Sequence, residues 1–332
     1  MHPTLTSVAE PRFGVFTAGD AVAAGYARED VGGLVARGRW VRLRRGVYAD
    51  RAVVDAVAGD PAARHRLNCA AVLVRLAPGP AVSHTSAARV LGLVAPRSQD
   101  DCVRLTDEAQ WRRGRGYEVT RASLPQGSVL PLGPFRVTAP ARTLVDCARG
   151  WSLEDAVVAM DDALHRRLVE PDELTAAVLA QTHWLGIGGA ARAAGLADGR
   201  AESPLETRGR LRILGSGLPA PELQVEIHDR HGFVGRVDGW YEEAAVAVEF
   251  DGFVKYEVPR DDRSPARVAW EEKRREDALR ALDIRVVRIA NADLGPAWPR
   301  VEERLAMLLA TPFAGPRRFT VVPAGRPVPR SA

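Results

Sequence analysis

The sequence predicts an α/β protein in three parts: a winged helix-turn-helix, a mixed α/β middle region and a C-terminal core with the element order α-β-β-β-α-β. Two helical segments precede a basic alternating hairpin, short alternating runs interrupt the helical middle, and alternating runs follow a capped helix after residue 201. The length of 332 residues is sufficient for two or three domains. We therefore expect domains at 1–55, 56–200 and 201–312, and a disordered tail at 313–332.

Composition limits the class of protein. Hydrophobic residues make up 46% and charged residues 27% of the chain, which excludes wholesale disorder. The apolar runs are too short to cross a membrane, and the N-terminus lacks the basic-then-apolar run of a signal peptide. Cys69, Cys102 and Cys147 lie far apart, as expected for reduced, buried thiols. We expect a soluble, cytoplasmic protein with no membrane partner.

The first 50 residues predict two helices and a hairpin. Residues 1 to 12 show no period, and we expect a loose arm there. Thr17 is the predicted N-cap of a first helix that ends at Gly25, and a second helix runs from Arg28 to Arg37. Residues 40–48 then alternate apolar and basic side chains around a glycine, which predicts two strands and a turn.

This order is typical of a winged helix-turn-helix, whose second helix enters the major groove of DNA while the wing meets phosphate. The alternative is a small helical domain with a solvated arginine face. Nearly all the basic residues are arginine, and only Lys255 and Lys273 are lysine; coding bias alone would produce this. The predicted DNA-contacting residues of this part are Arg28, Arg37, Arg39, Arg42, Arg44 and Arg45.

The middle region is predicted to be mostly helical, with strands near 103–105, 117–120 and 135–138. Arg142 and Asp146 are four residues apart on a predicted helix, which indicates a surface ion pair. We expect His84, at a helix start, to be structural. The glycines of 186–189 follow a helical stretch and not a strand, so we interpret them as a turn and not as a dinucleotide loop.

The first 200 residues resemble the AbiEi-type antitoxins of abortive-infection toxin–antitoxin systems. The resemblance rests on Phe16-Thr-Ala, the wing at 38–48, Val82-Ser-His-Thr-Ser-Ala-Ala88 and Val137-Thr-Ala-Pro-Ala-Arg-Thr-Leu-Val-Asp146. It implies a winged helix joined to a second domain, DNA binding by the first domain and repression of the antitoxin's own operon. Three protein partners are compatible with the resemblance: a toxin, another defence-system protein, or a second copy of this chain in a homodimer.

The C-terminal part begins with a predicted helix capped by Ser203, with Pro204 at its first position and Glu206 at its third. Predicted strands follow at 222–228, 233–241 and 245–251, then a helix at 267–282 and a strand at 284–289. A tight hairpin turning at residues 243–244 makes facing residue numbers sum to 487, which sets Asp238 opposite Glu249.

The acids of this hairpin favour a metal site. The period of two places Glu249 and Asp251 on one face of their strand. Carboxylates held this close are costly unless a cation neutralises them, and oxygen ligands favour Mg²⁺ or Mn²⁺. The alternative is a solvated acidic hairpin with ordinary surface carboxylates.

Residues 202–294 resemble the PD-(D/E)xK nuclease superfamily, specifically the DUF559 group related to very-short-patch-repair endonucleases. The motifs are Ser203-Pro-Leu-Glu206, Val237-Asp238-Gly239, Val248-Glu249-Phe-Asp251-Gly252, the helix residues 272–277 and Arg285-Val-Val-Arg288. The resemblance implies that Asp238 and Glu249 hold a metal and that Glu206 completes its shell. The chain departs from the superfamily at Asp251, which stands where the motif lysine belongs; Asp251 would then be a further ligand and catalytic residue.

Because the motif lysine is missing, we expect one of the two lysines of the chain to supply the cation. Lys255 lies just past the acids and is the predicted catalytic cation, while Lys273 lies on the following helix. Lys273 and Arg288 are predicted to contact DNA phosphate. The sequence thus predicts a Mg²⁺-dependent DNA endonuclease targeted by a winged helix. The alternative is a DNA-binding regulator whose nuclease domain is degenerate, and an RNA substrate remains open.

Overall fold

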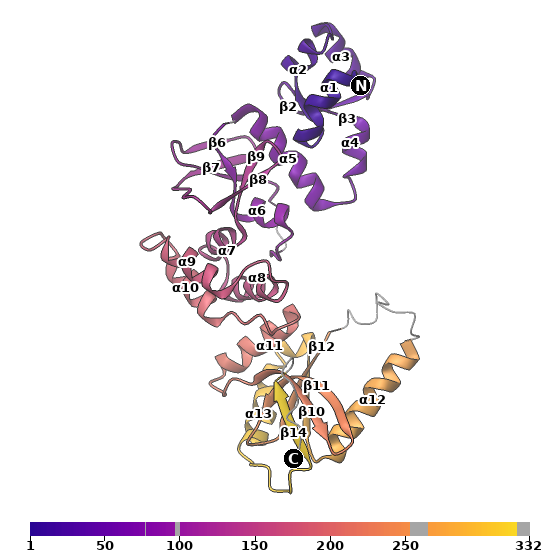
Figure 1. Cartoon of the computed structure of the whole chain (residues 1–332), viewed down its shortest axis with the longest axis vertical. Coiled ribbons are helices and arrows are strands. Elements are labelled where there is room, and N and C mark those ends of the chain that lie inside the picture. Colours follow the sequence, from indigo (N-terminus) through magenta and orange to yellow (C-terminus); the bar gives the residue numbers. More distant parts are fainter. Residues whose placement is uncertain (77, 97–99, 253–264, 324–332) are drawn as a thin grey trace. The chain divides into compact units, whose positions relative to one another are not determined.

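The computed structural model describes residues 1–76, 78–96, 100–252 and 265–323. The chain divides into two compact units, Met1–Leu196 and Ala197–Ala332 (Figure 1). The part before residue 55 has a core of its own around Leu5, Phe16 and Trp40, and Val15, Val47 and Ala49 of its sheet also pack with the helix Pro61–Leu76. The first two predicted domains are therefore parts of one unit.

The N-terminal part of the first unit has the predicted winged-helix order. Its elements are α1 (Pro3–Ala9), β1 (Val15–Thr17), α2 (Ala18–Ala23), α3 (Arg28–Ala36), β2 (Trp40–Arg44) and β3 (Val47–Asp50). The strands pair antiparallel in the order β1-β3-β2. Thr17 caps α2 through a reciprocal box with Asp20, as predicted. Gly46 has φ +71°, a value that suits glycine in the turn of the hairpin.

Residues 1 to 12 are not a loose arm, which corrects the prediction. Pro3–Ala9 forms α1 and Glu10–Arg12 a 3₁₀ turn. The His2 ring accepts a hydrogen bond from the Thr4 backbone N–H, and Leu5 is fully buried. Leu5 packs in the same core as Phe16 and Trp40. A segment of only seven residues shows about two turns of apolar spacing, which is too little to reveal a helix that tertiary packing stabilises.

The rest of the first unit surrounds a six-stranded sheet of order β6-β7-β5-β4-β9-β8. The strands are β4 (Ala81–Val82), β5 (Val103–Asp107), β6 (Arg112–Gly114), β7 (Tyr117–Arg121), β8 (Val129–Leu132) and β9 (Phe135–Thr138). The helices are α4 (Arg51–Ala56), α5 (Pro61–Leu76), α6 (His84–Leu91), α7 (Pro140–Ala148), α8 (Leu153–His165), α9 (Pro171–Leu179) and α10 (Ile187–Leu196). The three predicted middle strands are confirmed as β5, β7 and β9.

The second unit has the predicted order α-β-β-β-α-β. The elements are α11 (Pro204–Gly215), β10 (Glu222–Asp229), β11 (Gly232–Tyr241), β12 (Val246–Asp251), α12 (Pro265–Ala281), β13 (Arg285–Ala290), α13 (Trp298–Leu309) and β14 (Phe319–Pro323). Ser203 caps α11, as predicted. Gly239 pairs with Val248 and Tyr241 with Val246, which is the predicted register. The sheet order is β13-β12-β11-β10-β14, with β12 and β13 parallel.

This sheet is covered on both faces. Val246, Val248 and Phe250 pack in a core with residues of α11 and α13. Ala247, which alternates with them, packs with Leu279 of α12 on the other face. Figure 1 shows α12 and α13 on different sides of the strands. Glu249 shares the face of Ala247, so its carboxylate lies on the α12 side of the sheet.

The predicted disordered tail is corrected in part by β14, and its residues 324–332 lie outside the described residues. Phe319–Pro323 pairs antiparallel with β10 at the edge of the sheet. The Phe319 ring meets Trp240 edge-on, with the ring centroids 5.9 Å apart. The physical reason is a short Phe-Thr-Val-Val run, whose residues favour strands but whose signal is lost among the Pro, Gly and Arg that flank it.

Candidate functional site

Helix α3 presents a polar face and buries an apolar one. Val31 is 6% exposed, and Leu34 and Val35 are partly buried against the same core. Arg28 and Arg37 are exposed near its two ends. Asp30 accepts a hydrogen bond from the Ala27 backbone N–H at 3.0 Å, which satisfies a donor at the helix start. The exposed face of α3 is therefore available to a partner, while packing fixes the other face.

The β2–β3 wing carries two exposed arginines and one that is held inward. Arg42 and Arg45 are exposed, and Arg39 is exposed just before the wing. Arg44 Nη1 donates to the Arg115 carbonyl at 2.6 Å, and its Nη2 donates to the Gly116 carbonyl at 3.2 Å. Burial lowers the pKa of the Arg44 guanidinium below its ordinary value. Arg44 thus attaches the wing to the β6–β7 turn, and its phosphate contact stays a prediction.

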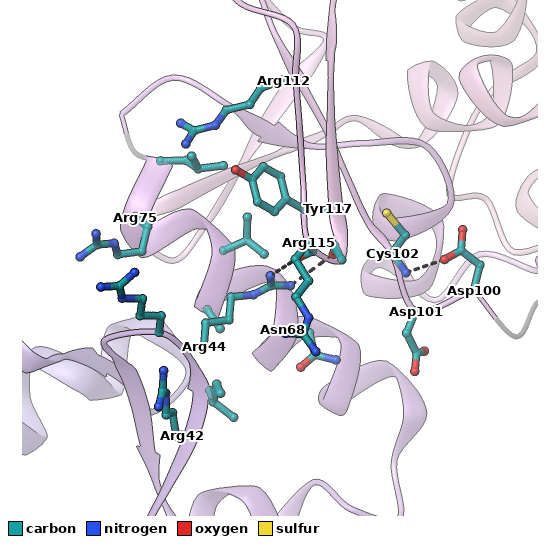
Figure 2. Close-up of a pocket in the computed structure, with 16 residues that line it drawn as sticks. Arg42, Arg44, Asn68, Arg75, Asp100, Asp101, Cys102, Arg112, Arg115 and Tyr117 are labelled. Atoms are coloured by element: carbon teal, nitrogen blue, oxygen red, sulfur yellow. Dashed lines mark hydrogen bonds between the residues drawn. The ribbon is translucent and has the colours of Figure 1, made fainter. Parts of the chain in front are cut away.

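A groove of about 1000 Å³ lies where the wing meets α5 and the β6–β7 hairpin. Six arginines line it against two aspartates: Arg42, Arg44, Arg45, Arg75, Arg112 and Arg115 against Asp100 and Asp101. Figure 2 shows Arg44 reaching the Arg115 backbone, with Arg42 apart from it on the wing. The sequence prediction missed the last three arginines, because nothing distinguishes them from the many others in the chain. The groove extends the positive charge of the wing, which suits a polyanion.

In the second unit, Glu206, Asp238 and Glu249 are electrostatically coupled. The charge of Asp238 raises the pKa of both glutamates, although burial is the largest cause for each. Asp238 accepts a hydrogen bond from the Phe250 backbone N–H at 2.8 Å, one residue past Glu249. Glu206 accepts from the Gln224 amide at 3.0 Å. These three predicted site residues are therefore neighbours: the register predicted this for Asp238 and Glu249, and the resemblance implied it for Glu206.

Protein donors already surround these carboxylates. Arg275 Nη2 lies 3.2 Å from Glu249 Oε1, and Arg288 Nε lies 3.7 Å from Glu249 Oε2. Arg288 Nη2 lies 2.7 Å from Glu276 as well, so the predicted phosphate contact of Arg288 competes with two acids. Arg275 and Glu276 were not predicted as site residues. They belong to a charged helix pattern that is typical of a solvated face.

Three further site residues were predicted in this unit: Asp251, Lys255 and Lys273. Asp251 is half-buried at the end of β12, level with Ala290 of β13. Lys273 is exposed on α12. Lys255, the predicted catalytic cation, lies outside the described residues. Within the described residues, no three or more His, Cys, Asp or Glu side chains are arranged to hold a metal ion. The oxygen donors suit Mg²⁺ by their chemistry, but their arrangement, with Glu249 facing two arginines, does not fit it.

The raised pKa of Glu249 predicts a pH dependence of stability. Its pKa lies above the ordinary 4.5 chiefly because burial disfavours the charge, so the folded state binds this proton more tightly than the unfolded state. The stabilisation is full below the unfolded pKa and is lost as pH rises through the folded pKa. We expect Glu249→Gln to make the fall in unfolding free energy above pH 4.5 shallower, as measured by urea unfolding. An unchanged slope would contradict this.

The fold and the exposed side chains define the class of the N-terminal part. A helix with one free face, followed by a hairpin with exposed arginines, is the architecture of a winged helix-turn-helix DNA-binding module. Residues 4–49 match the family model "Transcriptional regulator, AbiEi antitoxin". This part of the chain is therefore similar to the transcriptional regulators of the AbiEi antitoxin type. The match ends at the wing and leaves the nuclease prediction for the second unit without support.

Two curated relatives from Mycobacterium tuberculosis are similar to part of the chain: "Uncharacterized protein MT2308" of strain CDC 1551 / Oshkosh and "Uncharacterized protein Rv2248" of strain ATCC 25618 / H37Rv. Each is 36% identical over 124 residues, which is 37% of this chain and 46% of the relative. The chain thus matches less than half the length of either. The crystal structure of the RV2827C protein from Mycobacterium tuberculosis aligns with 68% of this chain and 85% of its own, at 15% identity and a TM-score of 0.36.

In the described residues, no helix combines the length and the apolar character that a membrane span requires.

Proposed function

We propose that this protein is a DNA-binding transcriptional regulator of the antitoxin type, which contacts DNA through the exposed face of α3 and the wing. The observation that carries the proposal is the match of residues 4–49 to the AbiEi regulator family, over the segment whose wing exposes Arg42 and Arg45. The α3 face supplies base contacts, and the wing arginines and the adjoining basic groove supply phosphate contacts. The natural target is the promoter of its own operon, and a toxin encoded beside it is the protein partner.

The wing arginines provide the test. We expect Arg42→Ala with Arg45→Ala to weaken binding to a duplex of the upstream region by about tenfold and to reduce the salt dependence by the share of two phosphate contacts. Fluorescence anisotropy across a range of salt concentrations measures both. Arg192→Gln, an exposed arginine of α10, is the matched control and should leave affinity unchanged. Equal affinity of the double variant and the wild-type protein would overturn the proposal.

A second candidate function is hydrolysis of DNA by the second unit. One observation favours it: the α-β-β-β-α-β order places Glu206, Asp238 and Glu249 within electrostatic reach of one another. Against it, Glu249 faces Arg275 and Arg288, so the regulator is the favoured proposal. Plasmid incubated with Mg²⁺ or Mn²⁺ separates the two. The regulator shifts DNA without cutting it, whereas cleavage that disappears in Asp238→Asn would establish the nuclease.

A further inference from the structure

A second, smaller pocket of about 330 Å³ lies in the first unit, and it shares no lining residue with the wing groove. Arg121 at the end of β7, Arg142 and Arg149 at α7, His84 at the start of α6 and Trp184 before α10 all line it. Two of these residues, His84 and Arg142, belong to the motifs at 82–88 and 137–146. The proposed DNA contact does not use them, so they require another explanation.

Arg142 is a buried cation with an incomplete set of partners. Only 6% of the residue is exposed. Its Nε donates to Asp146 Oδ2 at 2.8 Å, and its Nη1 donates to the Ser123 carbonyl at 3.0 Å. Its Nη2 is buried and has no hydrogen-bond partner among the described residues. Leaving a buried guanidinium N–H without an acceptor costs free energy. A ligand oxygen that reaches this N–H from the pocket would remove that cost and gain a hydrogen bond.

The Trp184 ring lies against two guanidinium groups of the pocket. It lies 4.9 Å from the guanidinium carbon of Arg142 and 5.0 Å from that of Arg149. The negative face of an indole attracts a cation but accepts no strong hydrogen bond, so the ring is a weak substitute for an oxyanion. Trp184 is half-buried, and the next residue, Leu185, is 91% exposed. The ring therefore lies at the edge of the packed core and is not enclosed by it.

The charge around the pocket is unbalanced. Arg121, Arg142 and Arg149 line the pocket, and the carboxylate that pairs with two of them is Asp146, which Arg142 contacts at 2.8 Å and Arg149 at 3.6 Å. Burial lowers the pKa of the His84 ring below its ordinary value, which disfavours its charged form. The excess of two positive charges matches a dianion. Among common biological groups, a phosphate monoester supplies two charges and several acceptor oxygens in a small volume.

We propose that this pocket binds a dianionic phosphate monoester group, held by Arg121, Arg142 and Arg149, with the Trp184 ring displaced on binding. The group has two sources, a free small metabolite or the terminal phosphate of a nucleic-acid strand. The internal phosphodiesters of a duplex carry one charge each and are not the ligand. This site is independent of the wing, so its failure and the failure of DNA binding are measured separately.

Inorganic phosphate is the first probe, titrated into the full chain at about pH 8, where it is dianionic, against chloride of equal ionic strength. We expect saturable heat in calorimetry and a change in tryptophan fluorescence. Trp184→Phe should keep the heat and lose most of the fluorescence change, which a purely structural role of the ring would not produce. No saturable heat, or an unchanged fluorescence response in Trp184→Phe, would overturn the proposal.

Variants of the pocket complete the test. Arg121→Gln removes an exposed cation and should weaken phosphate binding by about tenfold, and adding Arg149→Gln should abolish it. Arg192→Gln on α10 should bind phosphate as the wild type does. Equal binding by Arg121→Gln and wild type would refute the assignment. A nucleoside monophosphate and a 5′-phosphorylated strand, each in competition with phosphate, identify the source, whereas competition by an unphosphorylated duplex would overturn it.

Discussion

Asp146→Ala is expected to lower the unfolding free energy of the first unit by about 3 to 5 kcal/mol, because it leaves the buried Arg142 guanidinium without its counter-charge. The Asp146 side chain is 0% exposed and that of Arg142 7%. After the substitution, the Ser123 carbonyl is the remaining hydrogen-bond acceptor of Arg142. A lone buried cation retains most of its desolvation cost. Urea unfolding at neutral pH measures the loss.

An exposed pair in the same unit is the matched control. Asp162 and Arg166 of α8 are also four residues apart, with Oδ2 and Nη1 separated by 2.9 Å, but their side chains are 26% and 42% exposed. Asp162→Ala should therefore cost about 0.5 kcal/mol or less. Arg142→Met combined with Asp146→Ala should recover much of the loss, since an apolar side chain leaves no buried charge. Equal costs for Asp146→Ala and Asp162→Ala would show that burial does not set the strength of the pair.

These two pairs explain one error of the sequence prediction. The spacing of Arg142 and Asp146 predicts an ion pair correctly, but it predicts a surface pair, and both residues are buried. Spacing fixes which side chains of a helix meet. It does not fix which other elements cover them. In α7, the neighbouring Leu144 and Val145 are buried too, and burial runs without a break from residue 142 to residue 148, so the usual alternation of faces is absent there.

The second unit was more predictable because alternation along its strands is regular. Val246, Val248 and Phe250 on one face and Ala247 and Glu249 on the other fix both the strand and its register. The same argument placed Asp238 beside Glu249, and the hydrogen bond from the Phe250 N–H to Asp238 agrees with it.

The partners of these residues were not predictable from the sequence. Arg275 reaches Glu249 from a different element, and the inward turn of Arg44 depends on backbone carbonyls at residues 115 and 116. Contacts between segments far apart in the chain depend on tertiary packing, on which local patterns carry no information.

Gly209→Ala is expected to destabilise the second unit by about 3 kcal/mol, against the usual gain of about 1 kcal/mol for this change within a helix. Gly209 lies in α11, where the helix approaches β12. A Cβ atom there would lie 1.9 Å from Cε1 of Phe250, whose ring is 4% exposed and fixed in the core. Either the ring leaves its position or the helix moves away from the strand. Thermal and urea unfolding measure the cost.

Gly215, at the end of the same helix, is the control for this prediction. No atom lies within 4 Å of a Cβ built there, so Gly215→Ala should leave stability unchanged or raise it slightly. Phe250→Leu should partly rescue Gly209→Ala, because removing the ring edge reopens the space, and the two changes should therefore be non-additive. A stable Gly209→Ala protein, or strict additivity with Phe250→Leu, would contradict the close approach.

The close approach at Gly209 also positions the acidic residues. Glu206 lies three residues before Gly209, almost one turn along α11, and its carboxylate reaches the Gln224 amide of β10 at 3.0 Å. A helix displaced from β12 by an added methyl group carries Glu206 away from Gln224 and from the charge of Asp238. Burial, the largest cause of the raised pKa of Glu206, and the charge of Asp238 would then both raise that pKa less. Carboxyl titration of Glu206 by NMR in Gly209→Ala should therefore show a lower pKa than in the wild type, and an unchanged pKa would show that helix packing does not hold the cluster together.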